Sequence, residues 1–168
     1  MISKKMETAI NKQINLEIQS ALMYLQMSAH FSHENLNGFA HWMRIQHSEE
    51  LVHANRLFDY LLQRDGEVSL TAVAAPPHAW KTTIAACEAA YAAEVNNTRQ
   101  INALMDQAIK ENDHATRVIL EWFVEEQVEE ESSSLNLIKQ VQLAGNAAGA
   151  ILLLDRELGG RQPEPAGE

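Results

Sequence analysis

Four long segments of this chain each carry a line of apolar residues at three- to four-residue spacing, and an acidic, amide or imidazole side chain interrupts each line near its middle. This spacing corresponds to one face of an α-helix. A buried carboxylate is costly, and without a partner it takes up a proton. Four helices with the same costly interruption at the same level predict a bundle whose helices share a positively charged partner.

The sequence predicts helices with the following bounds. They run over about 3–31, 38–65, 83–110 and 113–143, with a short fifth helix over about 146–158 and a flexible tail over 159–168. Gly66 is expected to cap the second helix, Asp113 to cap the fourth at its start, and Gly145 to end it.

The predicted helices have core-facing lines that can be read from the spacing. The lines are Ile10, Ile14, Glu17, Ala21, Tyr24 and Ser28; Phe39, Met43, Gln46, Glu50, His53, Leu57 and Tyr60; Cys87, Tyr91, Glu94, Thr98, Ile101, Met105 and Ala108; and Phe123, Gln127, Glu130, Ser134, Leu137 and Val141.

The connection between the second and third helices determines the topology. The second helix spans about 42 Å. The connection over 66–81 reaches about 53 Å when extended, whereas a tight hairpin needs only a few residues. The chain can therefore return along the whole bundle, with the second and third helices parallel. We expect an all-α four-helix bundle with one long crossover, in a single domain over 1–168.

Composition restricts the function classes. The chain has 168 residues, of which 13 are basic and 23 acidic, giving a formal charge of −10. This balance argues against nucleic-acid binding and suits a protein that handles cations. One cysteine, Cys87, excludes an internal disulfide and a cysteine-rich metal site. The beginning "MISKKMETAINKQINLE" has no apolar signal core, and no run is long enough to span a membrane, so a cytoplasmic location without membrane contact is expected.

The polar interruptions form a pattern with metal-ligand chemistry. They are Glu17, Glu50, His53, Glu94, Gln127 and Glu130. Carboxylates with one imidazole suit a dinuclear iron site, in which a carboxylate bridges the two ions. Four carboxylates also balance two ferrous ions, or two ferric ions with an oxide. A single Glu-x-x-His pair more often marks a solvated face, but that explanation does not account for interruptions in four helices.

The stretch "FVEEQVEEE" adds acids beside this line. Glu126 and Glu129, together with Glu49 of the second helix, point off the core-facing stripe toward one wall of the bundle. Two readings stay open here, a further cation site and a solvated acidic face.

The chain resembles the bacterial non-haem ferritins, within the ferritin-like diiron family, from "NLEIQSALMYLQMSA" through "EELVHANRLFDYL" and "EEQVEEE" to "LDREL". The resemblance implies ferroxidase ligands at matching positions. It implies a first iron at Glu17, Glu50 and His53, a second at Glu50, Glu94 and Glu130 with Gln127 nearby, a third at Glu49, Glu126, Glu129 and Glu130 on the cavity side, and Tyr24 beside the pair.

The resemblance also implies a function and an assembly. It implies a homo-oligomeric shell of 24 subunits that oxidises Fe(II) with dioxygen or hydrogen peroxide and stores the ferric mineral. No haem is expected, because Val52 stands about where haem-binding relatives carry methionine. Arg117 and Leu120 fall at the expected positions of three-fold channel acids, so the route by which iron enters stays open. The alternatives are an iron-binding shell without catalysis and a discrete diiron oxidase.

Overall fold

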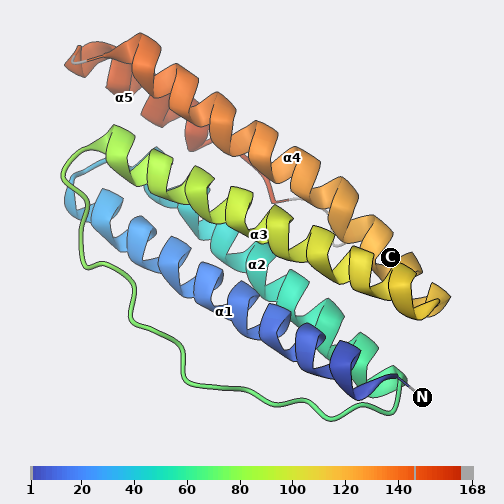
Figure 1. Ribbon diagram of the computed structural model, residues 1–168. Coiled ribbons are helices and arrows are strands. Elements are labelled where there is room, and N and C mark those ends of the chain that lie inside the picture. The colour runs from blue at the N-terminus through green and yellow to red at the C-terminus, as the bar shows by residue number, and fades with distance from the viewer. Residues whose placement is uncertain (1, 146, 164–168) are drawn as a thin grey trace.

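The computed structural model describes residues 2–145 and 147–163, which form five helices and no strand. The helices are α1 (Lys4–His33), α2 (Asn37–Gln63), α3 (Thr83–Glu111), α4 (His114–Ala144) and α5 (Ala148–Leu158). The four long helices lie side by side as a bundle, and α5 packs across one end of it (Figure 1). The expected all-α bundle is confirmed.

The crossover has the expected course. Residues 64–82 leave the end of α2, run alongside α1 over the length of the bundle and enter α3 at the opposite end (Figure 1). Helices α2 and α3 are therefore parallel, while α1–α2 and α3–α4 are antiparallel hairpins.

Two asparagines on α1 attach the crossover to the bundle. The Asn11 amide donates to the carbonyl of Glu67 (2.8 Å) and accepts from the amide of Ser69 (2.6 Å). One turn later, Asn15 donates to the carbonyl of Ser69 (3.1 Å) and accepts from the amide of Thr71 (2.8 Å). The side-chain amides thus pair with the backbone of the extended segment much as a neighbouring strand does, which satisfies its polar groups.

The helix ends follow the sequence closely, with one exception. The side chains of Ser3, Thr82 and Asp113 accept hydrogen bonds from the first turns of α1, α3 and α4, and Gly145 ends α4. Gly66 is not the residue in the left-handed conformation after α2. Asp65 takes that conformation (φ 57°), and the amide of Gly66 bonds back to the carbonyl of Leu61 (3.0 Å). A short polar side chain tolerates this conformation, so glycine is not required there.

Helix α2 receives its N-terminal cap from a distant part of the chain. The Asp155 carboxylate on α5 accepts from the amides of Gly38 (2.8 Å) and Phe39 (3.0 Å). A Cβ atom on Gly38 would lie 1.5 Å from the backbone oxygen of Asp155, so glycine is needed for the two helices to approach this closely. This contact fixes α5 to the end of the bundle where α2 begins.

A polar belt divides the apolar core of the described chain. One cluster surrounds Phe31 and Phe39 near α5, and the other surrounds Ile10 and Phe123 at the opposite end. The expected core-facing lines of α1, α2 and α4 are buried throughout.

The expected core-facing line of α3 was partly wrong. Tyr91, Thr98 and Met105 are half-buried. The buried residues at these levels are their neighbours Ala90, Asn97 and Leu104. Residues three and four positions apart share a helix face, so spacing alone did not distinguish the neighbours. Ala90 lies within the apolar cluster near α5, whereas Tyr91 packs against that cluster and stays partly exposed.

The segment after α5 begins differently from the expected flexible tail. Arg161 folds back onto α2 and contacts Gln46, Glu49 and Trp42. Residues 164–168 of that tail lie outside the described residues. None of the described helices combines the length and the apolar character needed to cross a membrane.

Candidate metal centre

The six polar interruptions lie between the two apolar clusters, and each is at least 95% buried. Each long helix contributes to this belt. The residues are Glu17 on α1, Glu50 and His53 on α2, Glu94 on α3, and Gln127 and Glu130 on α4. The helical spacing therefore brings them to one level of the bundle.

One compact group has unsatisfied ligand atoms. Glu17, Glu50 and His53 each offer one ligand atom, and these atoms lie within 4.8 Å of one another. Both carboxylate oxygens of Glu50 and the Nδ1 atom of His53 are buried without a hydrogen-bond partner among the described residues. An unsatisfied buried polar atom costs about 1–3 kcal/mol. A cation bound by these atoms removes that cost, so the donor set fits a metal ion.

Amide side chains hold Glu17 in place. Gln13 donates to Glu17 Oε1 (2.7 Å), and Asn97 donates to Glu17 Oε2 (2.9 Å). The Asn97 oxygen in turn accepts from Gln13, so the three side chains form a closed network between α1 and α3. Such a network fixes the direction of the carboxylate toward the centre of the bundle.

Glu94 lies apart from this group and contacts its own partners. Its Oε1 atom accepts a hydrogen bond from the buried Tyr24 hydroxyl. Gln127 Nε2 lies 3.3 Å from the carbonyl of Glu94 and 3.5 Å from its Oε2 atom. Tyr24 and Gln127 therefore lie beside a belt carboxylate.

A second compact group lies toward the acidic wall, the name used here for the side of the bundle that carries Glu49, Glu126 and Glu129. His53, Glu126 and Glu130 offer ligand atoms within 4.8 Å of one another. The Nε2 atom of His53 is 3.7 Å from Glu126 Oε1, and Glu130 Oε2 accepts from Gln46 (2.7 Å). The two groups share His53, whose nitrogen atoms face opposite ways, one toward each group.

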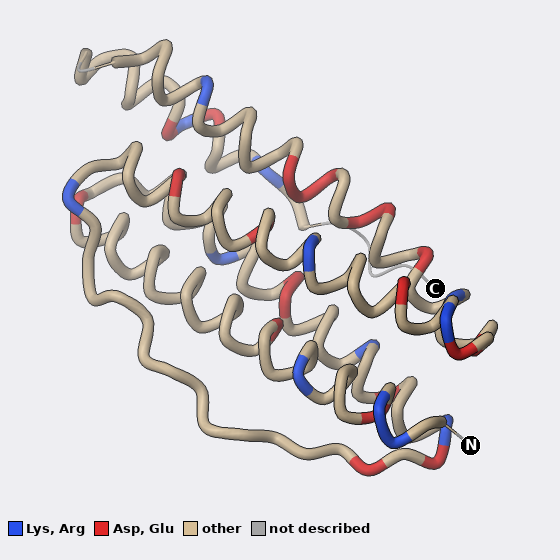
Figure 2. Tube along the Cα trace, viewed as in Figure 1, with Lys and Arg blue, Asp and Glu red and all other residues tan. Residues whose placement is uncertain are grey.

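The acids predicted for a third site are not all brought together. Figure 2 shows acidic residues gathered along the middle of α4. Of the predicted acids, Glu126 joins His53 and Glu130, whereas Glu49 pairs with Arg161 (2.9 Å). Glu129 is exposed and belongs to neither group of the described residues.

The electrostatics of the belt favour either protons or a cation. Burial raises the pKa of Glu50 well above its usual range, and the Glu94 carboxylate adds to the rise. Burial likewise raises the pKa of Glu94, and it raises the pKa of Glu130 to about 8. Burial lowers the pKa of His53, but the carboxylates of Glu126 and Glu50 outweigh burial, so the pKa lies well above the usual value. A cation that binds these groups therefore displaces protons.

Sequence reasoning missed four residues that support the site. Gln13, Gln46 and Asn97 each lie three or four positions from a belt glutamate on the same helix face, so their spacing carried a signal. Arg161 lies beyond α5, and nothing in its sequence surroundings indicated that it reaches α2.

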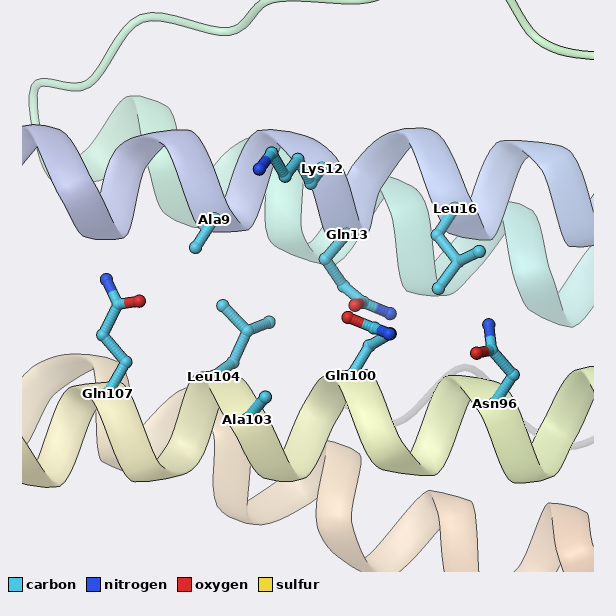
Figure 3. Close-up of a pocket in the computed structure, with 9 residues that line it drawn as sticks. All are labelled: Ala9, Lys12, Gln13, Leu16, Asn96, Gln100, Ala103, Leu104 and Gln107. Carbon is cyan, nitrogen blue, oxygen red and sulfur yellow. The ribbon is translucent and has the colours of Figure 1, made fainter.

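A surface pocket of about 260 Å³ lies between α1 and α3. Figure 3 shows that Gln13 and Gln100 point toward one another across it, with Asn96 to one side and Leu104 to the other. Gln13 also donates to Glu17, so one side chain separates this pocket from a candidate ligand. Gln13 therefore lies between this pocket and Glu17.

The expectation for Leu120 at a channel was wrong. Leu120 is fully buried in the apolar cluster that contains Phe123, so it cannot line a channel. Arg117 is half-buried, and the exposed residues beside Leu120 are Val118 and Glu121. An acidic residue is therefore available at the surface of this part of α4.

Comparison with known proteins identifies the family. The family model for the ferritin-like domain matches residues 7–144, which span nearly the whole bundle. The chain belongs to the ferritin family. A bacterial non-heme ferritin from Bacteroides fragilis is 38% identical over 161 residues, covering 96% of this chain and all of that protein. One from Escherichia coli O6:H1 is 34% identical, covering 94% of this chain and 96% of the relative.

A solved structure agrees with the ferritin assignment. The open pore ferritin of the hyperthermophilic archaeon Archaeoglobus fulgidus is 47% identical, with a TM-score of 0.95 over 96% of this chain and 100% of that one. The expected ferritin-like fold and the resemblance to non-haem ferritins are both confirmed.

Proposed function

We propose that this ferritin stores iron and is a ferroxidase, oxidising Fe(II) at a pair of sites in the polar belt. One observation carries the proposal. Both carboxylate oxygens of Glu50 are buried at the centre of the bundle without a hydrogen-bond partner among the described residues. The relatives named bacterial non-heme ferritin support iron storage as the general role.

The proposed ligands are those expected from the sequence. Glu17, Glu50 and His53 would hold one iron, and Glu50, Glu94 and Glu130 the other, with Gln127 beside it. Two ferrous ions release one electron each, which reduces dioxygen to hydrogen peroxide with two protons, or hydrogen peroxide to water. Four carboxylates offset the charge of the two ions before oxidation, and an oxide bridge preserves the balance afterwards.

The acidic wall and Tyr24 have supporting roles in this proposal. Glu126, together with Glu49, Glu129 and Glu130, would receive a third iron on its way from the pair to the cavity. Glu126 supports this path because it lies within reach of both His53 and Glu130. Tyr24 would steady Glu94 through its hydrogen bond and supply an electron when the pair is incompletely filled.

We also propose assembly into a shell of 24 subunits with a mineral core. Several large apolar residues of the described surface support burial between subunits, notably Leu143 (88% exposed), Leu153 (68%) and Leu152 (53%). The Archaeoglobus fulgidus relative is described as an open pore ferritin, and a closed form of it has been engineered by site-directed mutagenesis. The width of the pores is therefore a property to measure for this shell as well.

The experiment is rapid-mixing absorbance with two Fe(II) per subunit, using metal-free protein of verified mass. Glu50→Ala should abolish the fast oxidation phase, and His53→Ala should weaken the first site more than the second. Glu125→Ala, at an exposed glutamate on α4, is the matched control and should oxidise iron as the wild type does. Wild-type rates in Glu50→Ala would overturn the assignment of the pair.

The two alternatives give different results in the same samples. An iron-binding shell without catalysis would fill with iron at the uncatalysed rate, with no fast phase in the wild type. A discrete diiron oxidase would hold about two irons per chain and would have a mass far below about 450 kDa, which is 24 times 18.8 kDa. A particle of that mass that carries many more irons per chain excludes the discrete oxidase.

A further inference from the structure

Arg161 places a positive charge against the acidic wall. Its Nη2 atom lies 2.9 Å from Glu49 Oε2, and its Nη1 atom donates to Gln46 Oε1. The guanidinium carbon lies 4.9 Å from the centroid of the Trp42 ring. His41 Nε2 is 2.9 Å from the backbone oxygen of Arg161. Four contacts from α2 thus hold a residue that lies beyond the last helix.

The contact with Gln46 extends the influence of Arg161 to the belt. The Gln46 amide is fully buried, and its oxygen faces the guanidinium, which can only donate hydrogen bonds. The amide nitrogen is therefore directed at Glu130, whose Oε2 atom accepts from it (2.7 Å). The orientation of this amide, and with it one hydrogen bond to Glu130, depends on Arg161.

The contact with Glu49 has a different consequence. The side chains of Arg161 and Glu49 are 22% and 12% exposed, so their ion pair is partly shielded from water and salt. A metal ion that uses the bonded Glu49 oxygen has to displace the guanidinium from it. The protein and a metal therefore compete for the same carboxylate.

We propose that Arg161 is a built-in counter-cation of the acidic wall, which lowers the affinity of the wall for a metal ion and keeps Glu130 oriented toward the belt. This inference rests on the proposed function, because it assigns a regulator to the outward path of iron. Arg161 is a positioning residue, since it acts through Glu49 and Gln46. Because Arg161 occupies Glu49, a third iron ion at the acidic wall would bind weakly and leave readily.

The test uses Zn²⁺, a divalent ion without redox chemistry, titrated calorimetrically into assembled metal-free protein. The wall site is defined as the Zn²⁺ site that Glu49→Gln weakens. Arg161→Gln should tighten this site on the order of tenfold, about 1.4 kcal/mol. It should leave the belt site without Glu130 within about twofold, whereas the belt site that uses Glu130 should weaken a few-fold, because Gln46 loses the contact that orients it. The Zn²⁺ affinity of the wall site in Arg161→Lys should lie between those of the wild type and Arg161→Gln. An ammonium keeps the charge but cannot donate to Gln46 and Glu49 at once as the guanidinium does.

Two controls complete the design. Arg156→Gln removes a positive charge from an exposed position on α5 and should leave all Zn²⁺ sites as in the wild type. The double variant Glu49→Gln with Arg161→Gln should lose the gain in affinity, because the contested carboxylate is gone. Gel filtration of each variant verifies that the assembled mass is retained.

The outcomes separate this inference from the proposed function. Unchanged or weaker wall binding in Arg161→Gln, with both belt sites still present, would show that Arg161 only anchors the end of the chain. If Arg161→Gln does not assemble, equal wall affinities of Arg161→Lys and the wild type would overturn the inference. Absence of the two belt sites from the wild type would instead contradict the proposed function.

Discussion

The belt carboxylates differ in how the protein satisfies them. Glu17 accepts from two amides, Glu94 accepts from Tyr24, and Glu130 accepts from Gln46. Glu50 receives no such donor among the described residues. A carboxylate held by donors on one side keeps its other lone pairs directed inward. Glu50, with both oxygens unsatisfied, is the residue best prepared to touch two ions at once.

A first prediction concerns Tyr24. Tyr24→Phe keeps the ring and removes the hydroxyl that donates to Glu94, so stability should fall by about 1–2 kcal/mol. Oxidation should slow several-fold while Fe(II) affinity stays normal. Rapid-mixing absorbance at several iron loadings is the measurement. Superimposable traces for wild type and variant would make Tyr24 a packing residue.

The pH dependence of the metal-free protein is a second prediction. Glu130 has a pKa raised from 4.5 to about 8, so between these values the folded protein holds a proton that the unfolded chain has released. Stability therefore falls as pH rises through this window. Glu50, Glu94 and His53 contribute with the same sign, because their pKa values are also raised.

Glu130→Gln tests this pH dependence. The melting temperature of wild type in chelator should decrease from pH 5 to pH 8, and the decrease should be smaller in the variant. Parallel curves for the two proteins would contradict the raised pKa. Zn²⁺ should flatten the wild-type curve, since the bound cation replaces the protons.

At the scale of the elements, the contact between α5 and the start of α2 determines where the chain ends. Asp155 supplies the N-terminal cap that α2 lacks locally among the described residues, and Gly38 allows the close approach. This contact places Gly159 against Gly38 and leads the chain toward Arg161 on the face of α2. A short helix thus sets the position of the counter-cation proposed above.

A third prediction follows from this cap. Asp155→Ala leaves two backbone amides of α2 without their acceptor and should lower stability by about 1 kcal/mol. Asp155→Asn should keep most of the stability of the wild type, because the asparagine oxygen still accepts from the two amides. Thermal unfolding of the metal-free protein is the measurement, with the exposed Glu157→Ala as control. Equal losses in Glu157→Ala and Asp155→Ala would mean that the cap contributes nothing specific.

Much of the bundle could be predicted from the sequence because helix periodicity and caps are local. Asp113 marks the start of its helix, and the length of the crossover indicates that the second and third helices are parallel. The choice between Ala90 and Tyr91 required knowledge of how α3 is rotated against its neighbours. The fold-back of Arg161 and the cap from Asp155 depend on contacts between residues more than 100 positions apart, which no local pattern encodes.

The site was predictable to the same extent. Residues at three- and four-position spacing necessarily share a face, so Glu50 and His53 were placed together correctly. The sequence did not reveal which carboxylate oxygen each amide side chain would donate to, or that Glu49 would pair with Arg161. Leu120 was misplaced although it lies three positions before Phe123, so the same spacing already put it on the core-facing side of the helix.

At the scale of the whole molecule, one end of the chain carries exposed apolar residues. Leu143, Leu152 and Leu153 are each more than half exposed, at the end of α4 and on α5. Burying about 100 Å² of apolar surface contributes about 2.5 kcal/mol, so such residues are effective at subunit contacts. In the proposed shell, further copies of the chain would pack against this surface.

A fourth prediction tests that role. Leu153→Glu should keep the helical content of a single subunit and reduce the fraction that assembles, because a carboxylate is costly in a buried contact. Light scattering after gel filtration measures the mass. Val128→Glu, at a similarly exposed apolar position on α4, is a comparison away from α5. Full assembly of Leu153→Glu would show that α5 does not need this leucine for association.

The long crossover has a consequence for the order in which the protein can form. Glu17, Glu50 and His53 lie in the first hairpin, and Glu94, Gln127 and Glu130 lie in the second. Each hairpin is built from contacts between neighbours in sequence, which form fast, whereas joining them requires closure of a long loop. During synthesis the first hairpin emerges before the second exists, so it carries half of the proposed iron ligands without their counterparts. We therefore expect the hairpins to dock after each has formed, and the complete set of proposed ligands exists only from that point.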